Sequence, residues 1–194
     1  MFMKPYLPIN KITVSLKLLV ILICLFLNSI LYSQSYLAVT TSQVNLRTGP
    51  GTEHAIIKLL NPNANIFIIS SVPVGDFYNI VDIESNKEGY VHKSYVKFIE
   101  QVKPNEEGIF TPTGKTNSHG SELTVKNDTR LTLTLKFNDT TYSFSPNETK
   151  IINVSAGTYS YRASAPGVIP DFGTENIQSG TSYSWTFYIV TSYR

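Results

Sequence analysis

The chain has 194 residues and a formal net charge of +2, from sixteen lysines and arginines against fourteen aspartates and glutamates. Nucleic-acid binding depends on a basic excess that this balance lacks, so we expect no nucleic-acid partner. Many tyrosine, threonine, serine and asparagine residues favour β-structure, and the length allows one or two domains. The single cysteine, Cys24, lies in an N-terminal apolar run, so the rest of the chain can form neither a disulfide nor a cysteine-based metal site.

Residues 1–33 have the pattern of an export signal. Lys4, Lys11 and Lys17 form a positively charged beginning, and 18–27 is an unbroken apolar run that is short for a membrane span. Removal of this signal would leave thirteen basic and fourteen acidic residues, a net charge of −1. The remainder is therefore expected outside the cytoplasm, in the periplasm, in the cell envelope or in the extracellular space.

Two cleavage points and one alternative remain open for this segment. Cleavage after Ser33 would free Gln34, and cleavage after Ser35 fits the small-x-small pattern better because Ser33 lies two positions before it. Apolar residues resume at 30–32 and lengthen the run, so an uncleaved membrane anchor is the alternative. A membrane contact is expected only in that case.

Residues 36–100 predict a small barrel built from short strands. The apolar runs that we assign to strands are 37–46, 55–60, 66–72, 77–83 and 88–91, followed by a one-turn helix at 93–95 and an extended piece at 96–100. Turn-forming residues separate these runs at 61–63, 73–76 and 85–87. Short apolar runs separated by turn-forming residues are typical of a closed or half-closed barrel. About 65 residues bury only a modest core, so we expect the second domain or a partner to stabilise the barrel.

The turn at 49–51 is the most distinctive local feature. It lies inside the stretch Val-Asn-Leu-Arg-Thr-Gly-Pro-Gly-Thr at 44–52. Gly49 and Gly51 permit positive φ, and Pro50 fixes its own φ near about −65°, so the turn should be rigid before any ligand binds.

The motif Asn-Leu-Arg-Thr-Gly-Pro-Gly-Thr at 45–52, together with Gly-Tyr-Val at 89–91, resembles the bacterial SH3-like (SH3b) domains of secreted and cell-envelope proteins. The resemblance covers 37–100. Family members usually carry tryptophan where this chain has Phe77-Tyr78 and again at Tyr90. Aromatic residues thus replace aromatic residues, which is compatible with the same barrel.

The resemblance implies a shallow groove between the first long loop and the loop before the last strand, where aromatic side chains stack on a peptide or sugar. The candidate ligand-binding residues carried over by motif position are Asn45, Arg47, Tyr78, Tyr90, His92 and Tyr95. Structural roles are open for three of them: Arg47 could satisfy loop carbonyls, Asn45 could cap the turn, and Tyr90 could replace a core tryptophan.

Residues 101–121 have the composition of a linker, with prolines, glycines and charges around the single apolar pair Ile109-Phe110. Residues 122–194 predict a β-sandwich of six or seven antiparallel strands with short spacing. Alternation gives one packed face at Leu131, Leu133, Leu135 and Phe137. On the final strand, Tyr183, Trp185 and Phe187 share a face that predicts core, and Tyr188 on the opposite face is expected to be exposed.

The sequence shows no catalytic constellation. His54, His92 and His119 have no metal-ligand spacing, and no Gly-x-Ser-x-Gly elbow is present. We therefore expect a non-enzymatic protein that uses no cofactor and no metal. The prediction is an exported all-β binding module, a small SH3-like barrel followed by an antiparallel β-sandwich, whose partner is a cell-wall peptide or glycan. The alternative is a structural or assembly protein that binds an envelope protein.

Overall fold

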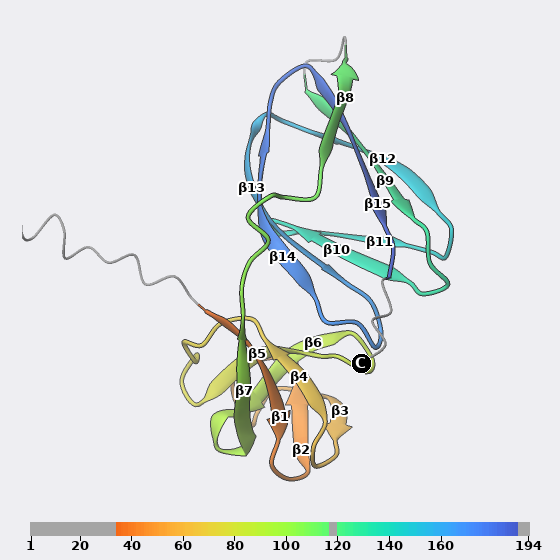
Figure 1. The fold of residues 1–194 in the computed structure, drawn as a ribbon. Coiled ribbons are helices and arrows are strands. Elements are labelled where there is room, and N and C mark those ends of the chain that lie inside the picture. Colours follow the sequence, from red (N-terminus) through yellow and green to blue (C-terminus); the bar gives the residue numbers. More distant parts are fainter. Residues whose placement is uncertain (1–33, 117–119, 190–194) are drawn as a thin grey trace, which may run out of the picture. The chain divides into compact units, whose positions relative to one another are not determined.

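A computed structural model gives the fold of residues 34–116 and 120–189, so the predicted export signal, Cys24 and His119 lie outside the described residues. Ser33–Arg194 forms one compact unit, and the regular secondary structure of its described residues is β-strand apart from one three-residue 3-10 helix (Figure 1). The expected all-β class is confirmed. No helix within the described ranges is long and apolar enough to cross a membrane.

The first seven strands form one sheet, here called sheet A, in the order β3-β2-β6-β5-β4-β1-β7 (Figure 1). Its strands are β1 (Ser35–Thr40), β2 (Val44–Arg47), β3 (Ile56–Leu60), β4 (Asn65–Ile68), β5 (Phe77–Asp82), β6 (Lys87–His92) and β7 (Val96–Val102). The predicted one-turn helix is present as η1 (Lys93–Tyr95). The end strands β3 and β7 do not pair, so this ladder is not closed into a complete barrel.

The first expected strand, 37–46, is divided into β1 and β2. At the break, the backbone N–H of Thr41 donates to the carbonyl of Tyr95 at 2.9 Å. Next to it, the buried Thr40 hydroxyl donates to the Asn61 carbonyl at 2.6 Å and accepts from the Ala64 N–H at 3.0 Å. These bonds turn the chain away from a straight ladder, which the apolar pattern of the run did not reveal.

The core of sheet A consists of aliphatic side chains: Ala38, Val44, Leu46, Leu60, Ile66, Ile68, Ile80 and Val91. Along β6, Gly89 and Val91 are buried while Tyr90 between them is half-buried. Successive side chains of a strand point to opposite faces, so Val91 fills the core and Tyr90 does not. The expectation that Tyr90 replaces a core tryptophan is therefore wrong.

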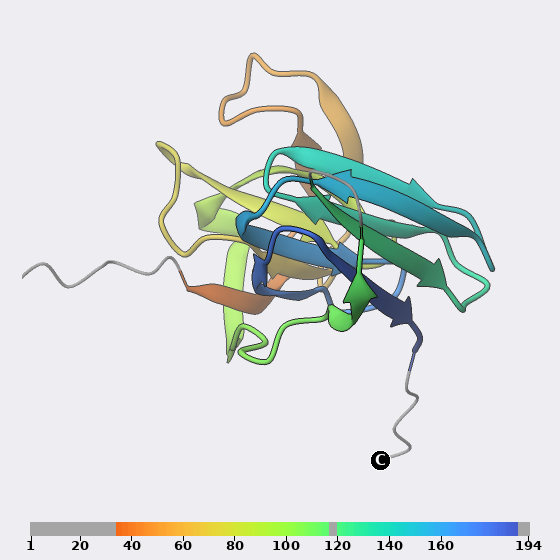
Figure 2. The ribbon, with the colours of Figure 1, turned by 90° about the horizontal axis from the view of Figure 1, so that it is seen from above.

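The remaining strands form two four-stranded sheets. Sheet B has the order β11-β10-β13-β14 and sheet C the order β12-β9-β15-β8 (Figures 1 and 2). Their bounds are β8 (Thr111–Lys115), β9 (Ser121–Asn127), β10 (Leu133–Phe137), β11 (Thr140–Phe144), β12 (Thr149–Val154), β13 (Gly157–Ser164), β14 (Asp171–Ile177) and β15 (Thr181–Phe187). One pair departs from the antiparallel expectation, because β15 runs parallel to β9.

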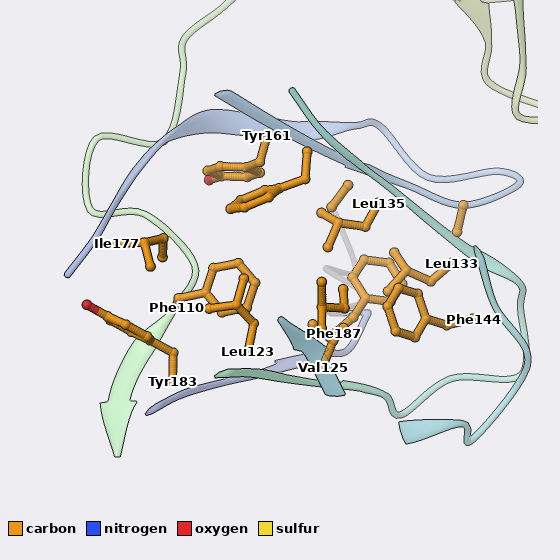
Figure 3. Close-up of a cluster of buried hydrophobic side chains, with 14 residues drawn as sticks. Phe110, Leu123, Val125, Leu133, Leu135, Phe144, Tyr161, Ile177, Tyr183 and Phe187 are labelled. Atoms are coloured by element: carbon orange, nitrogen blue, oxygen red, sulfur yellow. The ribbon is translucent and has the colours of Figure 1, made fainter. Parts of the chain in front are cut away.

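A single apolar cluster fills the space between sheets B and C (Figure 3). Leu123 and Val125 of β9 lie in it with Leu133 and Leu135 of β10, and all four are fully buried. The predicted packed face of 131–137 is thereby confirmed. The predicted core face of the last strand is confirmed by Tyr183 and Phe187, which are both buried. Trp185 is only partly buried and packs against the cluster from its margin.

The segment expected to be a linker contributes to the sandwich. Within it, Thr111–Lys115 is β8 and pairs antiparallel with β15. Phe110, only 8 % exposed, lies in the sandwich core, where its ring meets Phe137 edge to face at 5.9 Å. The apolar pair 109–110 therefore anchors this segment to the sandwich, a long-range contact that composition alone does not indicate.

Side chains of sheet A also meet side chains of sheet B. Glu88 of β6 forms ion pairs with Arg162 of β13 and with Lys136 of β10, the latter at 3.4 Å. Phe67 and Phe172 meet edge to face with ring centroids 5.5 Å apart. Burial opposes ionisation of Glu88, but the charges of Arg162 and Lys136 outweigh it and hold the pKa of the carboxyl below its ordinary value.

Replacing Glu88 should remove a pH-dependent contribution to stability. Because the native pKa of Glu88 lies below the unfolded value, near 4.5, its stabilisation is present above about pH 4.5 and is lost as the pH falls through the native pKa. We expect Glu88→Gln to melt a few degrees below the wild type at pH 7, with a difference that shrinks in acid. Thermal unfolding from pH 7 to pH 3 measures this, with the exposed Glu106→Gln as control. A difference that is constant with pH would contradict it.

Candidate functional site

A cavity of about 310 Å³ opens in the N-terminal domain beside β2, η1 and the loop that follows β2. It is lined by Gln43, Val44, Asn45, Arg47, Thr52, Phe77, His92 and Tyr95. Four of the six candidate residues from the sequence thus lie around one cavity: Asn45, Arg47, His92 and Tyr95. The other two, Tyr78 and Tyr90, are not among its lining residues.

Arg47 shapes the loop at one side of the cavity. Its Nη1 donates to the carbonyl of Thr52 at 2.9 Å and to the carbonyl of His54 at 2.8 Å. One nitrogen of the guanidinium group therefore satisfies two loop carbonyls, as the structural alternative expected. A guanidinium group has five N–H donors, so N–H groups beyond those on Nη1 remain to meet a ligand.

Gly49 lies against the side chain of His54 in the same loop. Neither Gly49 nor Gly51 has positive φ. A Cβ at Gly49 would instead lie 2.5 Å from Nδ1 of His54, and a Cβ at Gly51 would meet the flexible Glu53 carboxylate. Neither glycine uses the positive φ that its lack of a Cβ permits, and a side chain at Gly49 would require the His54 ring to move.

Three rings form the aromatic side of the cavity. The His92 ring meets Phe77 edge to face at 5.2 Å and Tyr95 at 5.8 Å with an interplanar angle of 59°. Nδ1 of His92 accepts a hydrogen bond from the Ser94 N–H at 3.3 Å, so the neutral ring carries its proton on Nε2. Phe77 is buried while Tyr95 is 41 % exposed, which leaves Tyr95 as the ring most open to a ligand.

The short helix η1 is held in place from two sides. The Lys93 N–H donates to the Asp76 carbonyl at 2.8 Å, and the Lys93 ammonium pairs with the Asp76 carboxylate at 2.8 Å. This hydrogen-bonded ammonium lowers the pKa of the exposed Asp76 carboxyl. The Thr41 N–H binds the carbonyl of Tyr95 from the other side. The position of Tyr95 is therefore fixed by backbone bonds before a ligand is present.

Tyr78 and Tyr90 have other surroundings. Tyr78 packs on the core of sheet A, and its ring meets Phe98 of β7 edge to face at 5.5 Å. Tyr90 lies opposite Arg47 on β2 and opposite Asn79 on β5. Neither tyrosine joins the ring cluster of the cavity.

Four lining residues were not among the candidates: Gln43, Val44, Thr52 and Phe77, the last of which lies where its neighbour Tyr78 was expected. In β5 the residues Phe77, Ile80, Val81 and Asp82 are all buried, so the strand lacks the simple alternation that would separate two faces. The hairpin of β5 and β6 places Phe77 opposite His92, a pairing that follows only once the centre of the turn between the two strands is known.

Residues 42–97 match the family model described as a bacterial SH3 domain. This match identifies residues 42–97 as a bacterial SH3 domain. The matched range contains every residue that lines the cavity described above. Bacterial SH3 domains are binding modules that are often associated with the cell wall. Searches of curated proteins and of solved structures found no match.

The described part of the chain contains no group of three or more histidine, cysteine, aspartate or glutamate side chains that could hold a metal ion. The cavity of the SH3 domain offers aromatic faces, the two side-chain amides of Gln43 and Asn45, and one guanidinium group. These groups suit non-covalent recognition by stacking and hydrogen bonding.

Gly89→Ala should destabilise the SH3 domain, because a Cβ at Gly89 would lie 2.5 Å from the backbone carbonyl oxygen of Arg47. The added methyl forces β2 and β6 apart, and we expect the free energy of unfolding to fall by about 1–3 kcal/mol. Gly114→Ala on β8 is the matched control, because nothing lies within 4 Å of its Cβ position. Urea unfolding measures both, and equal effects would contradict the close approach.

Proposed function

We propose that this protein is exported and binds a cell-wall peptide or another peptidoglycan component, without catalysis, through the cavity of its SH3 domain. The observation that carries the proposal is the ring cluster of Phe77, His92 and Tyr95 beside the polar side chains of Asn45 and Arg47. The charged beginning and apolar run within 1–33 support export.

The chemistry of the cavity fits a ligand that is partly flat and partly anionic. The exposed ring of Tyr95 offers a face on which a sugar or a peptide group can stack. Arg47 can bind a carboxylate or a carbonyl through the guanidinium N–H groups that the loop does not use, and guanidinium–carboxylate bonds are among the stronger polar contacts. The peptides of peptidoglycan carry both amides and carboxylates.

Tyr95→Ala should weaken retention of the purified protein on insoluble peptidoglycan. Loss of one exposed stacking ring is expected to raise the dissociation constant about tenfold, since such anchors contribute about 1–2 kcal/mol. The matched control is Tyr188→Ala, which removes a tyrosine that is 66 % exposed and lies outside the SH3 domain. Sedimentation with increasing amounts of peptidoglycan measures both variants.

Two outcomes would contradict the proposal. Equal retention of wild type and Tyr95→Ala would exclude the cavity as the wall-binding site. Absence of retention for the wild type would favour the alternative function, in which the SH3 domain binds an envelope protein. Circular dichroism and the melting temperature of each variant distinguish a lost contact from a lost fold.

A further inference from the structure

The β-sandwich has a cavity of its own, with a volume of about 680 Å³. It lies between the end of β15, the beginning of β14 and the segment that leads into β8. Among its lining residues are Ile109, Ile169, Asp171, Trp185, Thr186 and Tyr188. This cavity is separate from the SH3 cavity and shares no residue with it.

One edge of β15 is unpaired along this cavity. On that side β15 pairs with β8 from Thr181 to Ser184, where β8 begins at Thr111. On its other side β15 stays paired with β9 as far as Phe187, and the carbonyl of Phe187 accepts from the Asp128 N–H at 2.8 Å. Backbone groups of successive strand residues point to opposite edges, so the N–H and C=O of Thr186 face the side without a strand in the described residues. Residues 185–187 leave about 10 Å of open edge.

The buried carboxylate of Glu175 explains why the chain does not close this edge itself. Glu175 of β14 is 7 % exposed and accepts hydrogen bonds from the backbone N–H groups of Ile109 and Phe110, the latter at 2.9 Å. Gly108, with φ of 76°, turns the chain at that point, and a Cβ there would lie 2.5 Å from the same carboxylate. The backbone before β8 is thus held against β14 and does not pair with β15 beyond Ser184, although the Phe110 ring still meets the Trp185 ring at 6.1 Å.

The lining of the cavity indicates which chain could complete the edge. Ile169 and Tyr188 are exposed apolar side chains on it. Asp171 lines it, Glu106 and Glu107 lie on the loop between two other lining residues, and no lysine or arginine is among the lining residues. The surface therefore combines apolar and neutral polar side chains with the carboxylate of Asp171 and has no cation in its lining, which is complementary to a segment that carries apolar and basic side chains in alternation.

We propose that the open edge of β15 binds an extended, basic segment of a partner polypeptide, which adds to sheet C as a further strand. A polypeptide backbone offers N–H and C=O groups at the spacing that the edge of β15 requires, which a glycan does not. Its apolar side chains pack on Tyr188, and its basic side chains lie on the face of Trp185, where they meet Asp171 of β14. This interaction uses the sandwich and is independent of wall binding by the SH3 domain.

The test uses a fluorescein-labelled peptide of eight alternating valine and lysine residues, added to the full chain and followed by fluorescence anisotropy. We expect binding that N-methylation of alternate peptide amides weakens about fivefold, because it removes the one hydrogen bond that a peptide N–H donates to the outward carbonyl of Thr186. Thr186→Pro, which deletes the outward N–H, should weaken binding of the unmodified peptide to a similar extent, while Thr186→Val should leave it unchanged. A peptide of alternating valine and glutamate should bind more weakly than the lysine peptide.

Three results would overturn the proposal: absence of binding by the valine–lysine peptide, equal binding of its N-methylated form, or binding of a chitin hexasaccharide in its place. The N-methylated peptide tests the backbone contact even if Thr186→Pro fails to fold. Tyr95→Ala should not change peptide binding at β15, so failure of this site and failure of the SH3 site are distinguishable.

Discussion

The close approach of β2 and β6 is the constraint on which the SH3 domain depends. The β2–β3 hairpin joins the rest of sheet A through one residue pair, Arg47 with Tyr90. Gly89 makes this possible, because any side chain there would meet the Arg47 carbonyl and the side chains of Leu46 and Ile57. Arg47 also holds the following loop through the carbonyls of Thr52 and His54. Arg47 therefore contributes to the contact between β2 and β6, to the loop that follows β2 and to one wall of the cavity.

In the sandwich, one buried carboxylate determines the path of the backbone that leads into β8. Glu175 holds the backbone at Ile109 and Phe110, Phe110 enters the core, and β8 begins only at Thr111. The core is closed by this arrangement, while the edge of β15 beyond Ser184 stays open. The SH3 cavity and the cavity beside β15 thus have distinct chemistry: rings with a guanidinium group in the first, and a strand edge beside the Asp171 carboxylate in the second.

Local signals were the predictable part of this fold. Asparagines in the expected turns at 61–63 and 85–87 do take positive φ, at Asn63 and Asn86, and the alternation of 131–137 correctly gave a packed face. Motif position selected Asn45, Arg47, His92 and Tyr95 as candidates, and all four line one cavity. The features that were not predicted depend on contacts between residues that are distant in sequence. The inward position of Phe77, the parallel pairing of β15 with β9, and the recruitment of 111–115 as a strand are set by tertiary contacts that no local pattern encodes.

The central claim is that the SH3 cavity recognises a cell-wall component, and mapping of backbone amide chemical shifts during addition of soluble peptidoglycan fragments tests it most directly. Two amides report on the cavity: Ser94, which donates to His92, and Thr41, which donates to the carbonyl of Tyr95. The account predicts that these amides and those of Asn45 and Arg47 shift first and saturate together. Saturable shifts confined to other parts of the chain, or no shifts at all, would contradict it.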